Sequence, residues 1–232
     1  MKGLYIGVQA VFALISSSGI DQNVSYTGTV LDSGDGVTHI IPVVDGFVIN
    51  SCIKHIPLAG SNMTNFTANM IRDRNERCPV EEVNKIAKTI KEKYAYVVES
   101  GDLLGEFANF DNRMSNDKLK KKYEKYIEGV DPVSKVPYKV SVGPERFLAP
   151  EMFFNPEIVD EKYRQSVDEL VDKVIQLCPI DTRRDLYKNI ALSGGSTLFK
   201  GFKNRLERRV KERVDERLRK YEQISKRKVS VL

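Results

Sequence analysis

Hydrophobic positions divide the first quarter of the chain into one helix and a series of strands. Residues 4–15 are almost continuously apolar, which predicts a buried helix. Asp45-Gly46 is a pair typical of a two-residue hairpin turn, and Pro42 lacks an amide hydrogen, so we expect it at a sheet edge or a bulge. Short apolar runs around these residues predict three strands, at 26–31, 37–44 and 47–53.

A polar block with helical spacing occupies the middle of the chain. Its first part carries apolar residues at the three- and four-residue spacing of two helices, Met63, Phe66 and Met70 on one and Val83, Ile86, Ala87 and Ile90 on the other. From 101 to 137 this periodicity fades, and four of the five residues at 118–122 are lysines. Such a run is typical of a solvated face, so we expect a charged surface insertion there.

Strands and helices alternate again in the last part of the chain. Strands are predicted at 138–142 and 189–192, with a helix between them, and a long helix follows with an apolar stripe formed by Phe202, Leu206, Val210, Val214, Leu218 and Tyr221. This order predicts an α/β fold with a mixed sheet, flanking helices and an inserted, mostly helical subdomain. We expect the sheet-bearing part to comprise 1–60 and 143–232, and the insertion to comprise 61–142.

Composition excludes several classes of protein. Hydrophobic residues make up 41% of the 232 residues, which is enough for a core, and no apolar run has the roughly 18 residues of a membrane helix. Three cysteines and two histidines, without a Cys-x-x-Cys pair, argue against a disulfide scaffold and a structural zinc cage. The net charge of +5 equals the excess of nine basic over four acidic residues at 203–220. On an amphipathic helix without interleaved aromatic residues, this charge favours helix or solvent contact over phosphate binding.

The amino terminus allows two interpretations. Its apolar stretch is followed by three serines and a glycine, as in a secretory signal, and glycosylation sequons begin at Asn23, Asn62 and Asn65. Gln9 interrupts the stretch, however, and three cysteines cannot all pair. The alternative is a buried helix in a protein that is not secreted.

Two glycine turns are the candidate sites for chemistry. Asp32-Ser33-Gly34-Asp35-Gly36 combines glycines, whose amides can approach an anion, with carboxylates that would hold Mg²⁺ between themselves and a phosphate. An ordinary hairpin explains the same composition. Ser193-Gly194-Gly195-Ser196-Thr197 follows a strand and is expected to open a helix, a geometry that suits an anion or a flat ligand but also a close strand–helix turn.

Five segments, in order along nearly the whole chain, resemble motifs of the actin family. They are GLYIGVQAV at 3–11, DSGDGVTHIIP at 32–42, IKEKYAYV at 90–97, PERFLAPEMFF at 144–154 and NIALSGGSTLFKGFKNRL at 189–206. The combination of GDGVTH and LSGGST is specific, although either glycine turn alone is not. The resemblance implies a lobe of the actin/hexokinase-like ATPase fold with subdomains three and four, and it identifies 4–15 as the helix that links the two lobes rather than a signal.

The resemblance also implies a site for ATP and Mg²⁺. Asp32, Gly34, Asp35 and Gly36 would form the second phosphate loop, with Asp35 holding the metal through water. Gln9 would orient the attacking water, and His39 would lie behind the γ-phosphate. Lys91 and Glu92 would line the ribose and base, and Gly194, Gly195 and Leu198 would lie against the adenosine, so the second glycine turn would serve the nucleoside rather than an anion.

In function, the resemblance implies a nucleotide-dependent structural subunit of the complex that nucleates branched actin filaments. Its partners would be the other subunits and actin filaments, in the cytoplasm, without nucleic acid or membrane insertion. No segment of the sequence matches the family's first lobe with the first phosphate loop, so we do not expect tight ATP binding or turnover. The alternatives are a conventional actin, a chromatin-associated actin-related protein, and a sugar-kinase-like ATPase of the same broad fold.

Overall fold

The computed structural model describes residues 3–4, 6–17 and 25–228, and the chain in it divides into two compact units. Unit 1 comprises Met1–Ile56, Gln165–Thr197 and Leu206–Leu232, and unit 2 comprises Pro57–Arg164 and Leu198–Arg205. The insertion expected at 61–142 lies within unit 2, which takes in further residues on both sides of it. Within the described ranges, none of the helices has the length and apolar character needed to cross a membrane.

Unit 1 is built on a mixed sheet. Its strands are β1 (Gly28–Ser33), β2 (Thr38–Val44), β3 (Phe47–Val48), β4 (Lys54–Ile56) and β7 (Ile190–Ser193). The order is β3-β2-β1-β7, with β4 also paired to β2; β1 is antiparallel to β2 and parallel to β7. The predicted α/β class with a mixed sheet and flanking helices is therefore confirmed.

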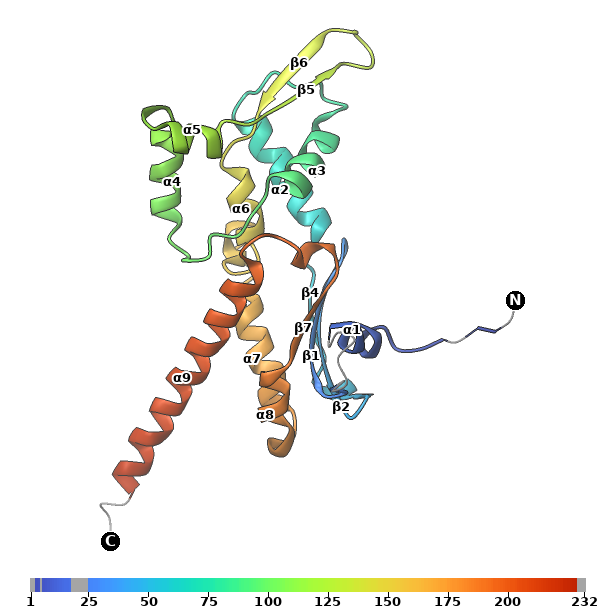
Figure 1. The fold of residues 1–232 in the computed structure, drawn as a ribbon, viewed down its shortest axis with the longest axis vertical. Coiled ribbons are helices and arrows are strands. Elements are labelled where there is room, and N and C mark those ends of the chain that lie inside the picture. The colour runs from blue at the N-terminus through green and yellow to red at the C-terminus, as the bar shows by residue number, and fades with distance from the viewer. Residues whose placement is uncertain (1–2, 5, 18–24, 229–232) are drawn as a thin grey trace. The chain divides into compact units, whose positions relative to one another are not determined.

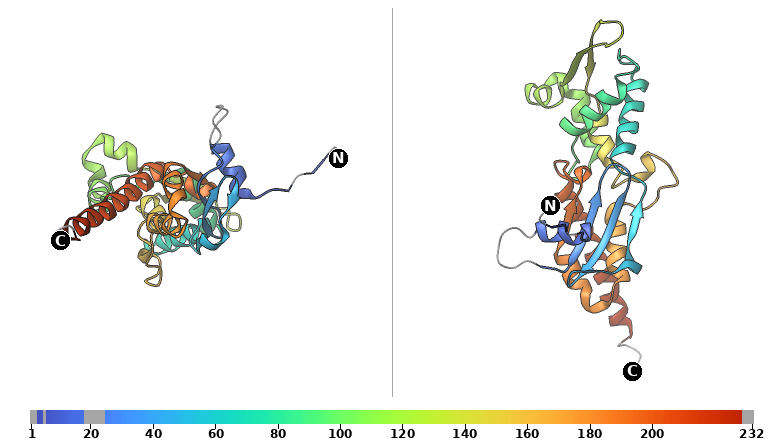
Figure 2. Two further views of the ribbon diagram at one scale, coloured as in Figure 1. Left: turned by 90° about the horizontal axis from the view of Figure 1, so that it is seen from below. Right: turned by 90° about the vertical axis from the view of Figure 1, so that its right-hand side faces the viewer.

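Helices cover both faces of this sheet (Figure 1). They are α1 (Gln9–Ser17), α7 (Val167–Leu177) and α8 (Ile180–Lys188), whereas the long α9 (Phe202–Lys228) contacts α7. Ala10 and Leu14 of α1 pack on Val30, Val43 and Ala191 of the strands, and the right-hand view of Figure 2 shows α1 in front of the sheet. The helices α7 and α8 contact β1 and β2 from the other side.

The first helix is shorter at its amino end than the sequence predicts. It begins at Gln9, and its first turn is closed by the amides of Val11 and Phe12, which donate to the carbonyl of Val8. Gly7 precedes this turn, and glycine opposes helix formation because it loses the most backbone freedom. Contrary to the sequence prediction, the run is also not buried throughout: in α1 Ala10 and Leu14 are buried, whereas Phe12 is exposed, as are Leu4, Ile6 and Val8 before the helix.

The third predicted strand is two short strands separated by a single 3₁₀ turn. β3 pairs with β2 at Val43 and Val44, the turn spans Asn50–Cys52, and β4 pairs with residues 38–40 of β2. Pro42 lies opposite the interruption, where it cannot donate to a neighbouring strand and instead accepts from the amide of Ile49 at 3.0 Å. It is thus inside the sheet rather than at an edge. The predicted hairpin turn is confirmed, with positive φ at both Asp45 and Gly46.

Arginines on one face of α9 contact acidic residues of α7. Arg213 Nε lies 2.5 Å from Asp168 Oδ2, and Arg209 Nε lies 3.5 Å from the same oxygen. One turn further on, Arg217 pairs with Asp172. The interpretation of the basic helix as a helix-contacting element is confirmed for this face.

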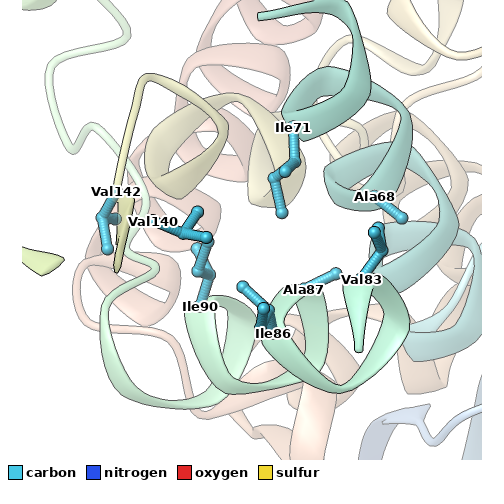
Figure 3. Packing of buried hydrophobic residues seen from close by; sticks show 8 residues of the cluster. All are labelled: Ala68, Ile71, Val83, Ile86, Ala87, Ile90, Val140 and Val142. Carbon is cyan, nitrogen blue, oxygen red and sulfur yellow. The ribbon is translucent and has the colours of Figure 1, made fainter. Parts of the chain in front are cut away.

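Unit 2 is mostly helical. Its helices are α2 (Gly60–Asp73), α3 (Val83–Lys93), α4 (Leu103–Asp111), α5 (Asp117–Tyr123) and α6 (Glu145–Glu151), and β5 (Tyr126–Val130) pairs with β6 (Pro137–Ser141). The stripe predicted for α3 contributes to its core, in which it packs with Ala68 and Ile71 of α2 and with Val140 and Val142 (Figure 3). Of the stripe predicted for α2, Met63 is buried, but Phe66 and Met70 are only half-buried, so the buried face of this helix differs from the prediction. Asn62 lies in the first turn of α2 and accepts a hydrogen bond from the amide of Ala59. Of the three sequons, Asn62 and Asn65 lie in α2, and Asn23 lies outside the described residues.

The segment 101–137 is not a structureless surface insertion. It contains α4, α5 and β5, and its Phe110 and Tyr123 are buried with Val98 and Phe147 in a second core cluster. These aromatic residues are not spaced along one helix face, so no helical period revealed them. The four lysines at 118–122 are exposed, as expected, but the segment around them also contributes buried aromatic residues to a core.

A polar cluster around Glu106, which we call the Glu106 hub, adjoins these aromatic rings. The carboxylate accepts hydrogen bonds from Tyr96 Oη, from Tyr123 Oη at 2.5 Å and from Lys122 Nζ at 2.6 Å. Burial alone would raise the pKa of Glu106, but the three donors outweigh it and hold the pKa below its usual range. One lysine of the predicted solvated run thus has an internal partner.

Candidate functional site

The turn between β1 and β2 carries most of the predicted phosphate-binding residues. Ser33 Oγ and Thr38 Oγ1 are buried and hydrogen-bonded at 2.7 Å, which closes the base of the turn. Gly34, Asp35 and Gly36 beyond it are exposed, and a Cβ built on either glycine would meet nothing within 4 Å. The turn is therefore anchored at its base and open at its tip, as a backbone cradle for an anionic group requires.

The second glycine turn lies directly against the first. Because β1 and β7 are parallel, with Asp32 opposite Ser193, the turns that follow them leave the same edge of the sheet. Gly194 has φ +87°, and a Cβ at this position would lie 2.2 Å from the carbonyl oxygen of Ser33, so only glycine allows the approach. Ser196 Oγ donates to the carbonyl of Gly34 at 2.8 Å and joins the two turns.

This location is the one that α/β folds use for ligands. In open sheets, binding sites form outside the carboxyl ends of parallel strands, where loops from neighbouring strands meet. The second turn differs from the prediction in one respect: it passes through a 3₁₀ turn at Gly195–Thr197, and α9 begins only at Phe202. Gly195 is exposed, with open space where a Cβ would be.

Gln9 and His39 lie beside the first turn. Gln9 is the first residue of α1, and its Nε2 donates to Asp32 Oδ2 at 2.9 Å. His39 of β2 is directly opposite Asp32 of β1 in the antiparallel register. Unit 1 thus brings together Gln9, Asp32, Gly34, Asp35, Gly36, His39, Gly194 and Gly195.

The other three predicted residues belong to unit 2. Lys91 is nearly buried, and its Nζ donates to the carbonyl of Gly60 at 2.9 Å. Glu92 is exposed, and its Oε1 lies 4.0 Å from Lys88 Nζ. Leu198 is 82% exposed. Their assignment to the nucleoside stays a prediction.

The donor set of the first turn fits Mg²⁺ held through water and phosphate. Within the described ranges, no three acidic, histidine or cysteine side chains converge on one point, so no all-protein metal cage is present there. Mg²⁺ characteristically keeps several waters and takes one or two carboxylates together with phosphate oxygens. Asp35, exposed at the tip of the turn, is suited to that outer contact.

Sequence reasoning did not single out Ser33 and Ser196. Both are buried hydroxyl residues next to a glycine turn, and their bonds hold the two turns in shape. The sequence did carry a signal for them, since each serine adjoins a glycine in one of the two turns. Its meaning depended on the parallel pairing of β1 with β7, which joins segments about 160 residues apart.

Comparisons with known proteins agree on one family. The sequence matches the family model described as Actin over residues 1–231. It is 49% identical over 231 residues to actin-related protein 3 of Drosophila melanogaster, covering 99% of this chain and 53% of the relative. It is 52% identical over 231 residues to actin-related protein 3 of Acanthamoeba castellanii, covering 99% and 52%. The chain spans about half the length of the curated relatives it matches.

Proposed function

Because the chain belongs to the actin family, we propose that it is an ATP- and Mg²⁺-binding, actin-related subunit of the actin-related protein 2/3 complex, which nucleates branched actin filaments. Its similarity to actin-related protein 3 of several organisms supports this choice within the family. The proposed partners are the other subunits of that complex and actin filaments, and the proposed location is the cytoplasmic actin cytoskeleton.

The observation that carries the nucleotide proposal is the pair of joined glycine turns. Gly34 and Gly36 leave open space at the tip of one turn, while Gly194 and Ser196 hold the other turn against it. An anion placed there would meet backbone amides without an intervening Cβ. The carboxylate of Asp35 would then require a cation between itself and the phosphates, and Mg²⁺ supplies that charge.

Gln9 and His39 have positions that suit polar roles around the phosphates. The bond from Gln9 Nε2 to Asp32 fixes the orientation of the side-chain amide and leaves its carbonyl oxygen to accept from a water. In this proposal His39 lies behind the terminal phosphate, and Lys91, Glu92, Gly194, Gly195 and Leu198 line the nucleoside.

We propose a structural rather than a metabolic role for the nucleotide. A sugar kinase of the same broad fold would need a carboxylate base facing its acceptor hydroxyl. Of the two carboxylates in the first turn, Asp32 is engaged by Gln9 and Asp35 is assigned to the metal. The nucleotide would therefore set the conformation of a subunit, with hydrolysis by this chain playing no part.

The nucleotide assignment is tested by Asp35→Ala in a full-length context. Loss of one charged contact should weaken Mg-ATP binding by about 1–3 kcal/mol, or roughly 5- to 150-fold. Titration with a fluorescent ATP analogue measures this change. Asp45→Ala, in the next turn of the same sheet, is the matched control and should leave affinity unchanged. Equal affinity of the Asp35→Ala variant and the unaltered protein would defeat the assignment.

The subunit assignment is tested by co-purification of the tagged protein from its own cells. We expect actin-related protein 2 and the remaining subunits of the complex in stoichiometric amounts. Recovery of chromatin proteins, or of conventional actin alone, would replace the proposal with the corresponding alternative. This outcome is independent of the ATP titration, so the two parts of the proposal can fail separately.

A further inference from the structure

The two histidines of the chain lie side by side in the sheet of unit 1. The sequence contains two histidines in total, His39 and His55. They are directly opposite each other in the antiparallel pair of β2 and β4, and their ring centroids are 6.0 Å apart. Directly opposed residues of neighbouring strands project from the same face, so both imidazoles share one local surface.

We propose that His39 and His55 together bind one divalent transition-metal ion, of which Zn²⁺ is the representative. Zinc binds imidazole nitrogen at about 2.0–2.1 Å in tetrahedral geometry, which places the centroids of two rings on one ion roughly 5 Å apart. The observed 6.0 Å is longer than that separation by about 1 Å, and the rings are tilted by 53° rather than stacked. A small shift of the exposed His55 ring toward His39 would direct one nitrogen of each imidazole to a common point.

The surroundings of the pair allow access and favour a cation. His55 is exposed and His39 is half-buried, so one ligand is reached from solvent. Asp32 is opposite His39 on the other side of β2, which extends the row across three strands with a carboxylate. Lys54 and Ile56 flank His55 in β4 and project from the opposite face of the strand.

The pair predicts a weak, exchangeable site rather than a structural one. Because no third acidic, histidine or cysteine side chain converges with two others within the described ranges, water would fill the remaining coordination positions. Two neutral imidazoles suit Zn²⁺, Ni²⁺ and Cu²⁺ and do not suit Mg²⁺, which prefers oxygen ligands. The histidine pair therefore differs in metal preference from the carboxylate turn. Because His39 is also assigned a place behind the terminal phosphate, the pair is tested without nucleotide.

Calorimetric titration of the nucleotide-free chain with zinc chloride tests the proposal. We expect one Zn²⁺ per chain, and at least tenfold weaker binding in His55→Gln and in His39→Gln. Since the chain has two histidines, NMR of ¹⁵N-labelled imidazoles should show both sets of ring signals shifting with the same zinc dependence. Cys78→Ser is the control for binding through the half-buried thiol and should titrate like the unaltered chain.

His55→Gln is the decisive variant because the side chain is exposed and its replacement leaves the strand pairing intact. Circular dichroism before each titration verifies that the variants are folded. Unchanged zinc binding in folded His55→Gln, or no binding at zinc concentrations up to about 1 mM, a level at which even a weak site is filled, would overturn the proposal. Loss of ATP binding in other variants would leave it unaffected.

Discussion

The β-meander of unit 1 and the α4–β5 segment of unit 2 are each held together by a different kind of contact. In the meander, β2 pairs with β1, β3 and β4 through backbone ladders, and aliphatic side chains such as Val30 and Val43 fill the core. In the α4–β5 segment, aromatic rings meet edge to face and polar groups converge on one carboxylate. Phe107 and Phe147 lie 5.0 Å apart, and Phe110 and Tyr123 lie 5.6 Å apart, measured between ring centroids.

The difference shows what a hydrophobic period can and cannot reveal. Alternation along a strand records which side faces a core, so the meander could be read locally. The contacts of the α4–β5 segment join residues on separate elements, as when Glu106 of α4 meets Lys122 and Tyr123 of α5. Such contacts depend on how separate elements pack against each other, which no short stretch of sequence reveals. We therefore expect that replacing single side chains lowers stability more in this segment, and that disturbing the backbone conformation lowers it more in the meander.

The largest effect is expected from Phe147→Ala. The ring is fully buried and contacts Phe107, Phe110 and Tyr96. Its removal should destabilise the protein by about 3–5 kcal/mol through lost burial and a residual cavity. Denaturant unfolding measures this value. Leu104→Ala in α4 is the matched control, because this leucine is 83% exposed and should cost less than about 0.5 kcal/mol. Similar losses in both variants would show that the aromatic cluster does not stabilise the segment.

The next effect concerns the Glu106 hub. Glu106→Gln keeps the side chain's size and removes the charge that Tyr96, Tyr123 and Lys122 contact, so we expect a loss of about 1–3 kcal/mol at neutral pH. Glu128→Gln, on the exposed Lys139–Glu128 pair of the β5–β6 hairpin, is the control and should change stability little. A loss no greater than that of the control would contradict the importance of the hub.

The pH dependence of Glu106→Gln sharpens the same test. Hydrogen bonds from Lys122, Tyr123 and Tyr96 hold the folded-state pKa of Glu106 below its usual range despite burial. The carboxylate therefore contributes stability above its unfolded pKa of about 4.3, and this contribution is lost as pH falls through the lower folded pKa. The stability difference between the protein and the variant should shrink on acidification. A difference that grows on acidification would contradict the sign of the shift.

The fold could be predicted where burial followed a simple period. The stripe of α3, the hairpin at Asp45-Gly46 and the mixed sheet were accessible in this way. The start of α1 and the interruption of the third strand were not, because they depend on Gly7 and on the missing donor of Pro42. In each case the error came from extending an apolar pattern across a residue whose backbone prevents it.

The candidate site could be predicted in part. The residue types of the first turn indicated a phosphate and a metal, and the resemblance to actins supplied Gln9 and His39. Bringing the second turn against the first required the parallel pairing of β1 with β7, and the link from Ser196 to Gly34 follows from it. No local pattern encodes that pairing. The cross-strand contact of His39 with His55 was hidden for another reason: the 3₁₀ turn at Asn50–Cys52 shifts the register of β4 against β2.

A smaller effect, on the meander side, is expected from Gly46→Ala. Gly46 has φ +81°, a conformation that alanine adopts at a cost, although a Cβ there would meet no neighbouring atom. The loss should be about 1 kcal/mol from backbone strain alone. Thermal unfolding measures it, with Gly36→Ala as a control at an equally open position without positive φ. Equal losses of stability in the two variants would show that the positive φ at Gly46 does not determine the stability of the meander.

The smallest effect separates two adjacent lysines of α5. Lys122 Nζ contacts Glu106 and Tyr123, whereas Lys121 is an exposed member of the same helix. The side chain of Lys122 is itself 47% exposed, so solvent screens its ion pair and Lys122→Ala should cost about 0.2–1 kcal/mol. Lys121→Ala should cost less, since alanine is also the better helix former. Denaturant unfolding at low and high salt measures both, and the Lys122 effect should diminish as salt rises. Equal stability of the two variants at low salt would mean that the ion pair of Lys122 adds no measurable stability. The two tyrosine hydroxyls alone would then stabilise the carboxylate of Glu106.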